Sequence, residues 1–176
     1  YADLFSSLNK GYILVEYTGY SNDNIKPSHA AIKNDIENVV DYLNEKQITA
    51  VTVVGESIGT GAASYHTYLA APTKLILISP FTNLTDVAAK RFWFYPTKWL
   101  VKDAYKNEEL LSNYQNKSLI IHGTQDKIIP ENLGRTLYES LSQKSDATYH
   151  PIDGAGHNDL FIYPETYSII SAFIRN

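Results

Sequence analysis

Short apolar runs alternate with amphipathic stretches along most of this chain. The apolar runs are rich in β-branched residues and bounded by turn or polar residues, which predicts buried strands at 12–17, 51–54, 74–79, 118–122 and 147–150. Apolar residues that recur every three or four positions predict helices at 28–46, 62–70, 131–143 and 164–174. Strands that alternate with helices predict an α/β fold with a doubly wound, mostly parallel sheet and helices on both faces.

One of these strands runs directly into a turn in which glycines surround a serine. The stretch 51–64 reads VTVVGESIGTGAAS, and its Gly-Glu-Ser-Ile-Gly matches the pattern G-x-S-x-G. In that pattern a strand turns sharply into a helix and holds the serine in a strained backbone conformation. We expect glycine two residues before and two residues after Ser57 because a Cβ there would collide with the turn or its neighbours. Ser57 is the candidate nucleophile; the alternative is a glycine-rich turn that merely contains a serine.

Two residues that could activate this serine follow later strands. Asp126 lies in GTQDKIIP, after the predicted strand 118–122, and His157 lies in PIDGAGHNDL, after 147–150. Sites on parallel sheets form at the carboxyl ends of the strands. A serine hydroxyl becomes a good nucleophile when a histidine takes its proton and a carboxylate orients that histidine. The chain order Ser57, Asp126, His157 therefore predicts a catalytic triad.

Other residues in the same loops leave alternatives. Asp153 and Asp159 flank His157, although a neighbour in sequence seldom points at the far nitrogen of an imidazole. His122 and Gly123 are interpreted as the strand end that aims Asp126. No close ligand spacing such as H-x-x-x-H occurs, so the sequence does not predict a metal site.

Composition narrows the class of protein. A chain of 176 residues with 44% hydrophobic content is most simply a single domain over 1–176. Its net charge of −4 and its lack of a long basic run argue against nucleic-acid binding. The absence of cysteine fits a reducing compartment and favours a cytoplasmic location, and no apolar run is long enough to span a bilayer. The chain also lacks methionine, so we expect that Tyr1 is not the initiator residue. A targeting segment could then precede Tyr1 without being visible in this sequence.

The region 81–117 is where a lid or cap would be inserted into such a fold. It contains the aromatic residues Phe92, Trp93, Phe94 and Tyr95, which could line a substrate pocket for an acyl chain. The alternative is that these rings pack a short helical cap onto the sheet. Basic residues lie among them and suggest contact with a membrane surface, namely Lys90, Arg91, Lys98 and Lys102.

These motifs together resemble the α/β-hydrolase superfamily, in particular its small serine hydrolases that look like protein depalmitoylases and related acyl hydrolases. GESIG resembles the nucleophile turn, HGTQDKIIP the segment that bears the acid, and GAGHNDL the segment that bears the base. VEYTGYS resembles the family's D-Y-R-G-Y-G-x-S, with Glu16 and Thr18 as departures. The resemblance covers nearly the whole chain and implies that Ser57 is the nucleophile, His157 the general base and acid, and Asp126 the orienting carboxylate.

The expected activity is hydrolysis of an ester or thioester through an acyl-enzyme on Ser57. Backbone N–H groups should hold the oxyanion, one of them from Ile58 at the helix start. The expected partner is a small-molecule or acylated substrate, and no cofactor is implied. Two alternatives stay open: a serine peptidase with the same triad, and a binding or scaffold protein that keeps the fold without turnover.

The resemblance also implies a segment upstream of the predicted strand 12–17. In the family, a strand that ends in a His-Gly loop precedes the short helix expected at 1–11. That strand lies between the strands that correspond here to 12–17 and 51–54, and its loop supplies the second oxyanion donor. We therefore expect this N-terminal segment in the same or another chain.

Overall fold

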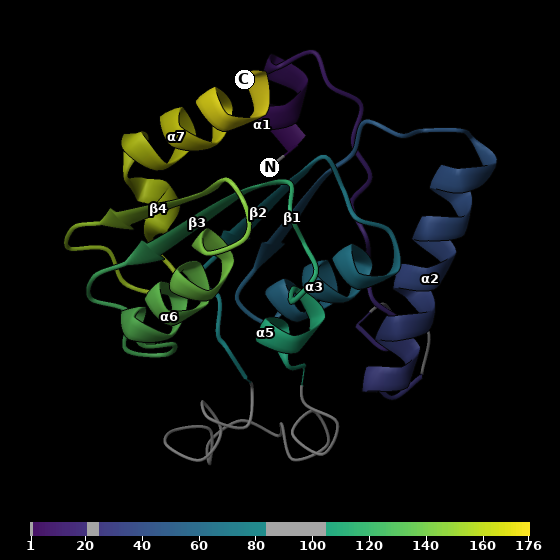
Figure 1. Cartoon of the computed structure of the whole chain (residues 1–176), viewed down its shortest axis with the longest axis horizontal. Helices are drawn as coiled ribbons and strands as arrows, with labels where there is room; N and C mark the ends of the chain where they lie inside the picture. Colours follow the sequence, from purple (N-terminus) through teal and green to yellow (C-terminus); the bar gives the residue numbers. More distant parts are fainter. Residues whose placement is uncertain (1, 21–24, 84–104) are drawn as a thin grey trace.

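The computed structural model describes residues 2–20, 25–83 and 105–176 of the chain (Figure 1). Within these ranges no helix is long and apolar enough to cross a membrane. The elements follow in the order α1 (Ala2–Ser7), α2 (His29–Glu45), β1 (Thr52–Glu56), α3 (Gly59–Leu69), β2 (Lys74–Ile78), α5 (Asn107–Leu110), β3 (Lys117–Gly123), α6 (Glu131–Ser142), β4 (Ala147–Ile152), the 3₁₀ turn η3 (Leu160–Ile162) and α7 (Pro164–Arg175).

The four described strands form one parallel sheet in the order β1-β2-β3-β4. Helices α1 and α7 cover one face of this sheet, and α3, α5 and α6 cover the other (Figure 1). Helix α2 packs against α3 rather than directly on the strands. The expected doubly wound α/β fold is confirmed. Because all four strands run in the same direction, their carboxyl ends lie along one edge of the sheet.

The core lies on both faces of the central strands. In β2, Leu75 and Leu77 face a cluster that includes residues of α3 and α6. Their neighbours Ile76 and Ile78 face the cluster formed with α1 and α7. All four side chains are completely buried. Successive side chains of a strand point to opposite faces, so a strand covered on both sides is apolar at consecutive positions, which is the pattern of the four residues after Lys74 in KLILI.

The segment 12–17 is not a strand, so this prediction is wrong. Tyr12, Ile13 and Leu14 are 47%, 48% and 62% exposed, whereas Tyr17 packs against the cluster formed by α2 and α3. A strand needs a neighbouring strand to receive its backbone hydrogen bonds. In the described part of the chain, no strand pairs with this segment or with the outer edge of β1. The apolar pattern of the segment was therefore insufficient to predict its conformation.

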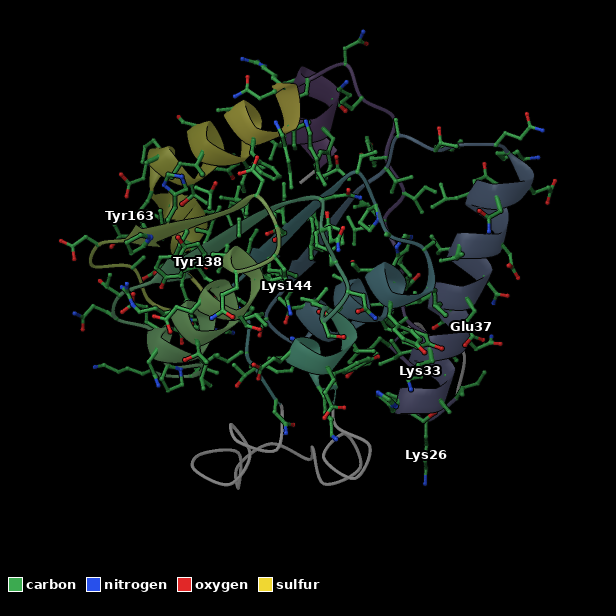
Figure 2. The ribbon with its side chains drawn as sticks, in the orientation of Figure 1. Lys26, Lys33, Glu37, Tyr138, Lys144 and Tyr163 are labelled. Atoms are coloured by element: carbon green, nitrogen blue, oxygen red, sulfur yellow. The ribbon has the colours of Figure 1, made fainter. Side chains whose placement is uncertain are left out.

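Helix α2 lies outside α3, the helix that follows Ser57, and packs against it. It begins after Ser28, whose side chain accepts a hydrogen bond from the N–H of Ala31 at 3.1 Å. Lys33 and Glu37 project from this helix (Figure 2). Both reach Tyr65 of α3: its hydroxyl donates to Glu37 Oε1 at 2.6 Å, and Lys33 Nζ lies 4.8 Å from the ring centroid. These contacts support the apolar packing between the two helices.

Candidate active site

Ser57 lies on the turn between β1 and α3, at the carboxyl edge of the sheet. Its φ of 52° is in the left-handed region, which residues with a Cβ adopt only at a cost. The turn is fixed on two sides, because the Ser57 N–H donates to the carbonyl of Ile78 at 2.8 Å and the Thr60 hydroxyl donates to the Ser57 carbonyl at 2.6 Å. Hydrogen bonds to the neighbouring strand and the following helix thus hold the strained residue in place.

The two glycines of the G-x-S-x-G turn differ in what surrounds them. A Cβ built on Gly55 would lie 2.6 Å from the carbonyl oxygen of Gly59 and 2.7 Å from Cβ of Ala63, so no side chain fits there. A Cβ built on Gly59 would meet only Tyr17 Oη, at the ordinary distance of 3.8 Å. The expectation of a collision holds for Gly55 and is wrong for Gly59. Gly59 begins α3 at a point where the space beside the helix is open.

The structure brings the three predicted residues together in one chain of hydrogen bonds. Ser57 Oγ lies 2.7 Å from His157 Nε2, and His157 Nδ1 lies 2.7 Å from Asp126 Oδ2. An ionised carboxylate can only accept, so the proton between His157 and Asp126 is assigned to Nδ1. This tautomer leaves the Nε2 lone pair free to accept the proton of the Ser57 hydroxyl.

The carboxyl group of Asp126 is buried and heavily hydrogen bonded. Its side chain is 0% exposed, and Oδ1 accepts the backbone N–H groups of Ile128 and Ile129 at 2.8 Å each. Burial by itself would raise the pKa of Asp126, but hydrogen bonds from His122, His157 and the Ile129 N–H hold this pKa well below its usual range. Asp126 is therefore ionised at neutral pH and presents a negative charge to His157.

The two other carboxylates considered from the sequence make different contacts. Asp159 Oδ1 accepts the N–H of Gly156 at 2.5 Å, within the loop that carries His157. Asp153 Oδ1 accepts the hydroxyl of Thr124 at 3.2 Å. Both carboxylates shape the loops around the site, and Asp126 is the one hydrogen bonded to the imidazole.

A second histidine also touches this carboxylate, which the sequence reasoning did not foresee. His122 Nε2 lies 3.4 Å from Asp126 Oδ2 and 2.9 Å from the carbonyl oxygen of Ile129. The spacing of four residues in HGTQD was a visible signal. Spacing alone does not show which way the ring points, so the sequence predicts only a strand end at this position.

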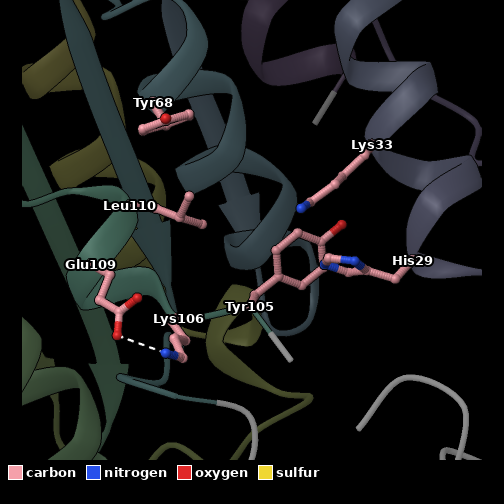
Figure 3. Close-up of a pocket in the computed structure, with 7 residues that line it drawn as sticks. All are labelled: His29, Lys33, Tyr68, Tyr105, Lys106, Glu109 and Leu110. Carbon is pink, nitrogen blue, oxygen red and sulfur yellow. Dashed lines mark hydrogen bonds and ion pairs between the residues drawn. The ribbon is translucent and has the colours of Figure 1, made fainter. Parts of the chain in front are cut away.

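Two cavities on the described surface bear on the question of a substrate site, and one of them borders the hydrogen-bonded chain. It has a volume of about 330 Å³ and is lined by Gln125, Lys127, Ile128, Gly156, His157, Asn158 and Asp159. The other has a volume of about 480 Å³ and is lined by His29, Lys33, Tyr68, Tyr105, Lys106, Glu109 and Leu110 (Figure 3). The larger cavity includes none of the three predicted site residues. Of these two cavities, the one beside His157 therefore borders the predicted catalytic residues.

The aromatic residues expected to line a substrate pocket lie outside the described residues, and so do the basic residues among them. This applies to Phe92, Trp93, Phe94 and Tyr95 and to Lys90, Arg91, Lys98 and Lys102. The lid, the acyl pocket and the membrane contact stay predictions. Among residues 2–20, 25–83 and 105–176, no three His, Cys, Asp or Glu side chains are grouped to hold a metal ion.

A hydroxyl, an imidazole and a buried carboxylate at the carboxyl edge of a doubly wound sheet define the class of α/β-hydrolases. Residues 14–157 match the family model described as "Serine hydrolase (FSH1)". The chain belongs to this serine hydrolase family. The resemblance to α/β-hydrolases inferred from the motifs is thereby confirmed.

Known proteins with similar sequences are longer than this chain. It is 30% identical over 183 residues to alpha/beta hydrolase domain-containing protein 17B of Homo sapiens, covering 99% of this chain and 59% of that protein. It is 28% identical over 155 residues to an uncharacterized protein of Mycobacterium tuberculosis, covering 86% of this chain and 54% of that protein. The chain thus spans between half and three fifths of the length of these relatives.

Solved structures show the same fold. A monoacylglycerol lipase from Paleococcus ferrophilus superposes with a TM-score of 0.70 at 18% identity, covering 99% of this chain and 88% of that chain. An α/β-hydrolase enzyme from a lagoon-sediment metagenome superposes with a TM-score of 0.64 at 16% identity, covering 91% and 75%. At these identities the likeness concerns the fold alone.

The different surroundings of the two glycines can be tested by unfolding. Gly55→Ala should lower the free energy of unfolding by about 1–3 kcal/mol, because the added methyl group overpacks the contact between β1 and α3. Gly59→Ala is the matched control, and it should be neutral or stabilising by up to about 1 kcal/mol, because alanine favours the helix. Urea unfolding of both variants measures the difference. A larger loss of unfolding free energy for Gly59→Ala than for Gly55→Ala would contradict the packing around these two glycines.

The buried carboxylate of Asp126 should make a contribution to the free energy of unfolding that depends on pH. The pKa of Asp126 is lower in the folded than in the unfolded chain, so its ionised form stabilises the fold above about pH 4, and this contribution is lost as the pH falls toward the folded pKa. The difference in unfolding free energy between wild type and Asp126→Asn should therefore narrow progressively below about pH 4. Asp153→Asn serves as the surface control. A difference of equal size at pH 3 and pH 7 would rule out this linkage.

Proposed function

We propose that the protein hydrolyses ester or thioester bonds by two-step acyl transfer through Ser57. The observation that carries this proposal is the 2.7 Å contact between Ser57 Oγ and Nε2 of His157. In the first step Ser57 Oγ bonds to the carbonyl carbon while Nε2 takes the hydroxyl proton. His157 then gives this proton to the leaving group, and the acyl group stays on the serine as an ester.

The second step repeats the same chemistry with water as the nucleophile. His157 takes a proton from water, the resulting hydroxide bonds to the acyl carbon, and the Ser57 oxygen leaves as its proton is returned. Asp126 remains ionised throughout. Its hydrogen bond to Nδ1 holds the imidazole in the required tautomer and stabilises the imidazolium that forms in each step.

The start of α3 is proposed to stabilise the negative charge that develops on the carbonyl oxygen. Ile58 directly follows the nucleophile and occupies the N-cap position of this helix. N–H groups at a helix start point outward toward an anion, and the helix dipole favours negative charge there. Loss of one such donor typically lowers kcat by about 10²–10³-fold.

The substrate is proposed to be a small molecule or an acylated partner that reaches the edge of the sheet beside His157. The adjoining cavity of about 330 Å³ has room for part of a small substrate. A peptidase is the second enzymatic candidate. Solved structures of similar fold include a monoacylglycerol lipase and an acylaminoacyl peptidase, with TM-scores of 0.70 and 0.68, so the fold does not discriminate between the two substrates.

The nucleophile can be tested before any substrate is known. A fluorophosphonate probe should label the full-length protein at Ser57, because the hydroxyl is activated by His157. Ser57→Ala should abolish labelling, whereas Ser142→Ala, which changes an exposed serine of α6, should not. Peptide mapping by mass spectrometry locates the label. Labelling of another serine, or none on the folded protein, would instead favour a binding or scaffold role.

The substrate class can be tested by comparing leaving groups. The full-length protein should cleave p-nitrophenyl esters of graded acyl length with a higher kcat/KM than aminoacyl anilides. Absorbance assays measure both reactions, and Ser57→Ala gives the background for each. Faster cleavage of the anilides would replace the ester proposal with the peptidase.

A further inference from the structure

The imidazole of His122 is enclosed between the end of β3 and helix α6. Its side chain is 0% exposed. A Cβ built on Gly134 of α6 would run into His122 Nδ1, so glycine at this position makes room for the ring. Packing from α6 therefore fixes the position of the imidazole, and no substrate can touch it.

The neighbours of the ring assign its proton. Nε2 lies 2.9 Å from the carbonyl oxygen of Ile129 and 3.4 Å from Asp126 Oδ2, and both oxygens can only accept. The Nε2–H group thus donates to the Ile129 carbonyl and also faces the carboxylate. Nδ1 has no hydrogen-bond partner among the described residues. A proton on Nδ1 would be a buried donor without an acceptor, so this nitrogen carries the lone pair.

These contacts connect His122 to both ends of the turn that presents the acid. Asp126 Oδ1 accepts the N–H groups of Ile128 and Ile129, which closes the turn 126–129. The carbonyl of Ile129, at the end of this turn, accepts from His122. Oδ2 of the same carboxylate lies between His122 and His157. The buried Nε2–H group of the His122 side chain thereby contacts both the end of the turn and the carboxylate.

We propose that His122 is a positioning residue that holds Asp126 Oδ2 at hydrogen-bonding distance from His157. This inference rests on the proposed function, in which Asp126 orients His157 and His157 activates Ser57. His122 takes no part in proton transfer, because its Nε2 proton is donated to the Ile129 carbonyl and its Nδ1 is enclosed by α6 at Gly134. Without this N–H group the turn could shift, and a misplacement of about 1 Å can cost about 10²-fold in rate.

Two substitutions of His122 distinguish the effect of its N–H group from the effect of the size of its ring. His122→Gln places an amide N–H the same number of bonds from the backbone as Nε2, whereas His122→Met has a similar length and no donor. In the full-length protein we expect His122→Met to lower kcat for a p-nitrophenyl ester by about 10- to 100-fold, with KM nearly unchanged. His122→Gln should recover most of this loss. Assays are made well below the melting temperature of each variant, so the comparison concerns folded protein.

A measurement on the unmodified protein covers the case in which His122→Met does not fold. Nitrogen NMR of the wild-type protein labelled with ¹⁵N-histidine should show His122 with the proton on Nε2 and a bare Nδ1. His122→Gln identifies the signal by its loss. A proton on Nδ1 instead would overturn the proposal, because Nε2 could then not donate to Ile129 or Asp126.

The kinetic outcomes also separate this inference from the proposed function. If fluorophosphonate labels wild-type Ser57 and His122→Met keeps full kcat, the positioning role is wrong and the hydrolase proposal stands. Equal losses in His122→Gln and His122→Met would also refute the role of the N–H group. If the folded wild-type protein neither labels nor hydrolyses esters, the proposed function fails and the positioning role fails with it.

Discussion

Parallel pairing of buried strands is the constraint on which the rest of this structure depends. Ser57 and His157 are 100 positions apart, and Asp126 and His157 are 31 positions apart. They meet because the carboxyl ends of parallel strands must lie at the same edge of the sheet. Each side chain then needs only a short loop to reach its neighbour. The apolar residues of β2 and β3 thus determine the geometry of the polar site, although none of them takes part in its chemistry.

Burying a carboxylate at this edge imposes a second constraint. An ionised group removed from water must be compensated by hydrogen bonds, and an unpaired one would be strongly destabilising. Asp126 receives two backbone N–H groups on Oδ1 and faces two imidazoles at Oδ2. The donors that make burial tolerable also prevent the carboxylate from turning away from His157. Stability and orientation therefore have the same structural cause at this residue.

Much of the fold could be predicted from sequence, because its signals are local. The run KLILI marks a strand covered on both faces, and β3 and the helix boundaries followed from similar patterns to within a few residues. The segment 12–17 was mispredicted because strand formation also requires a partner, which a pattern within one segment does not reveal. The convergence of Ser57, Asp126 and His157 was predictable because each of them follows a strand of the same parallel sheet. The contact between His122 and Asp126 was not, since it depends on which way a buried ring points.

The glycines explain how the loops of the site come close enough to form hydrogen bonds. A Cβ on Gly123, at the end of β3, would collide with the carbonyl oxygens of Ala155 and Gly156 in the loop that carries His157. A Cβ on Gly134 would collide with the imidazole of His122. By contrast, Gly59 belongs to the motif but has open space beside it. Whether a glycine is sterically required therefore depends on the atoms packed beside it, and not on whether it belongs to the motif. At this site, the absence of a side chain on Gly123 lets the loop that carries His157 lie against β3, and the absence of one on Gly134 leaves room for His122 beside α6.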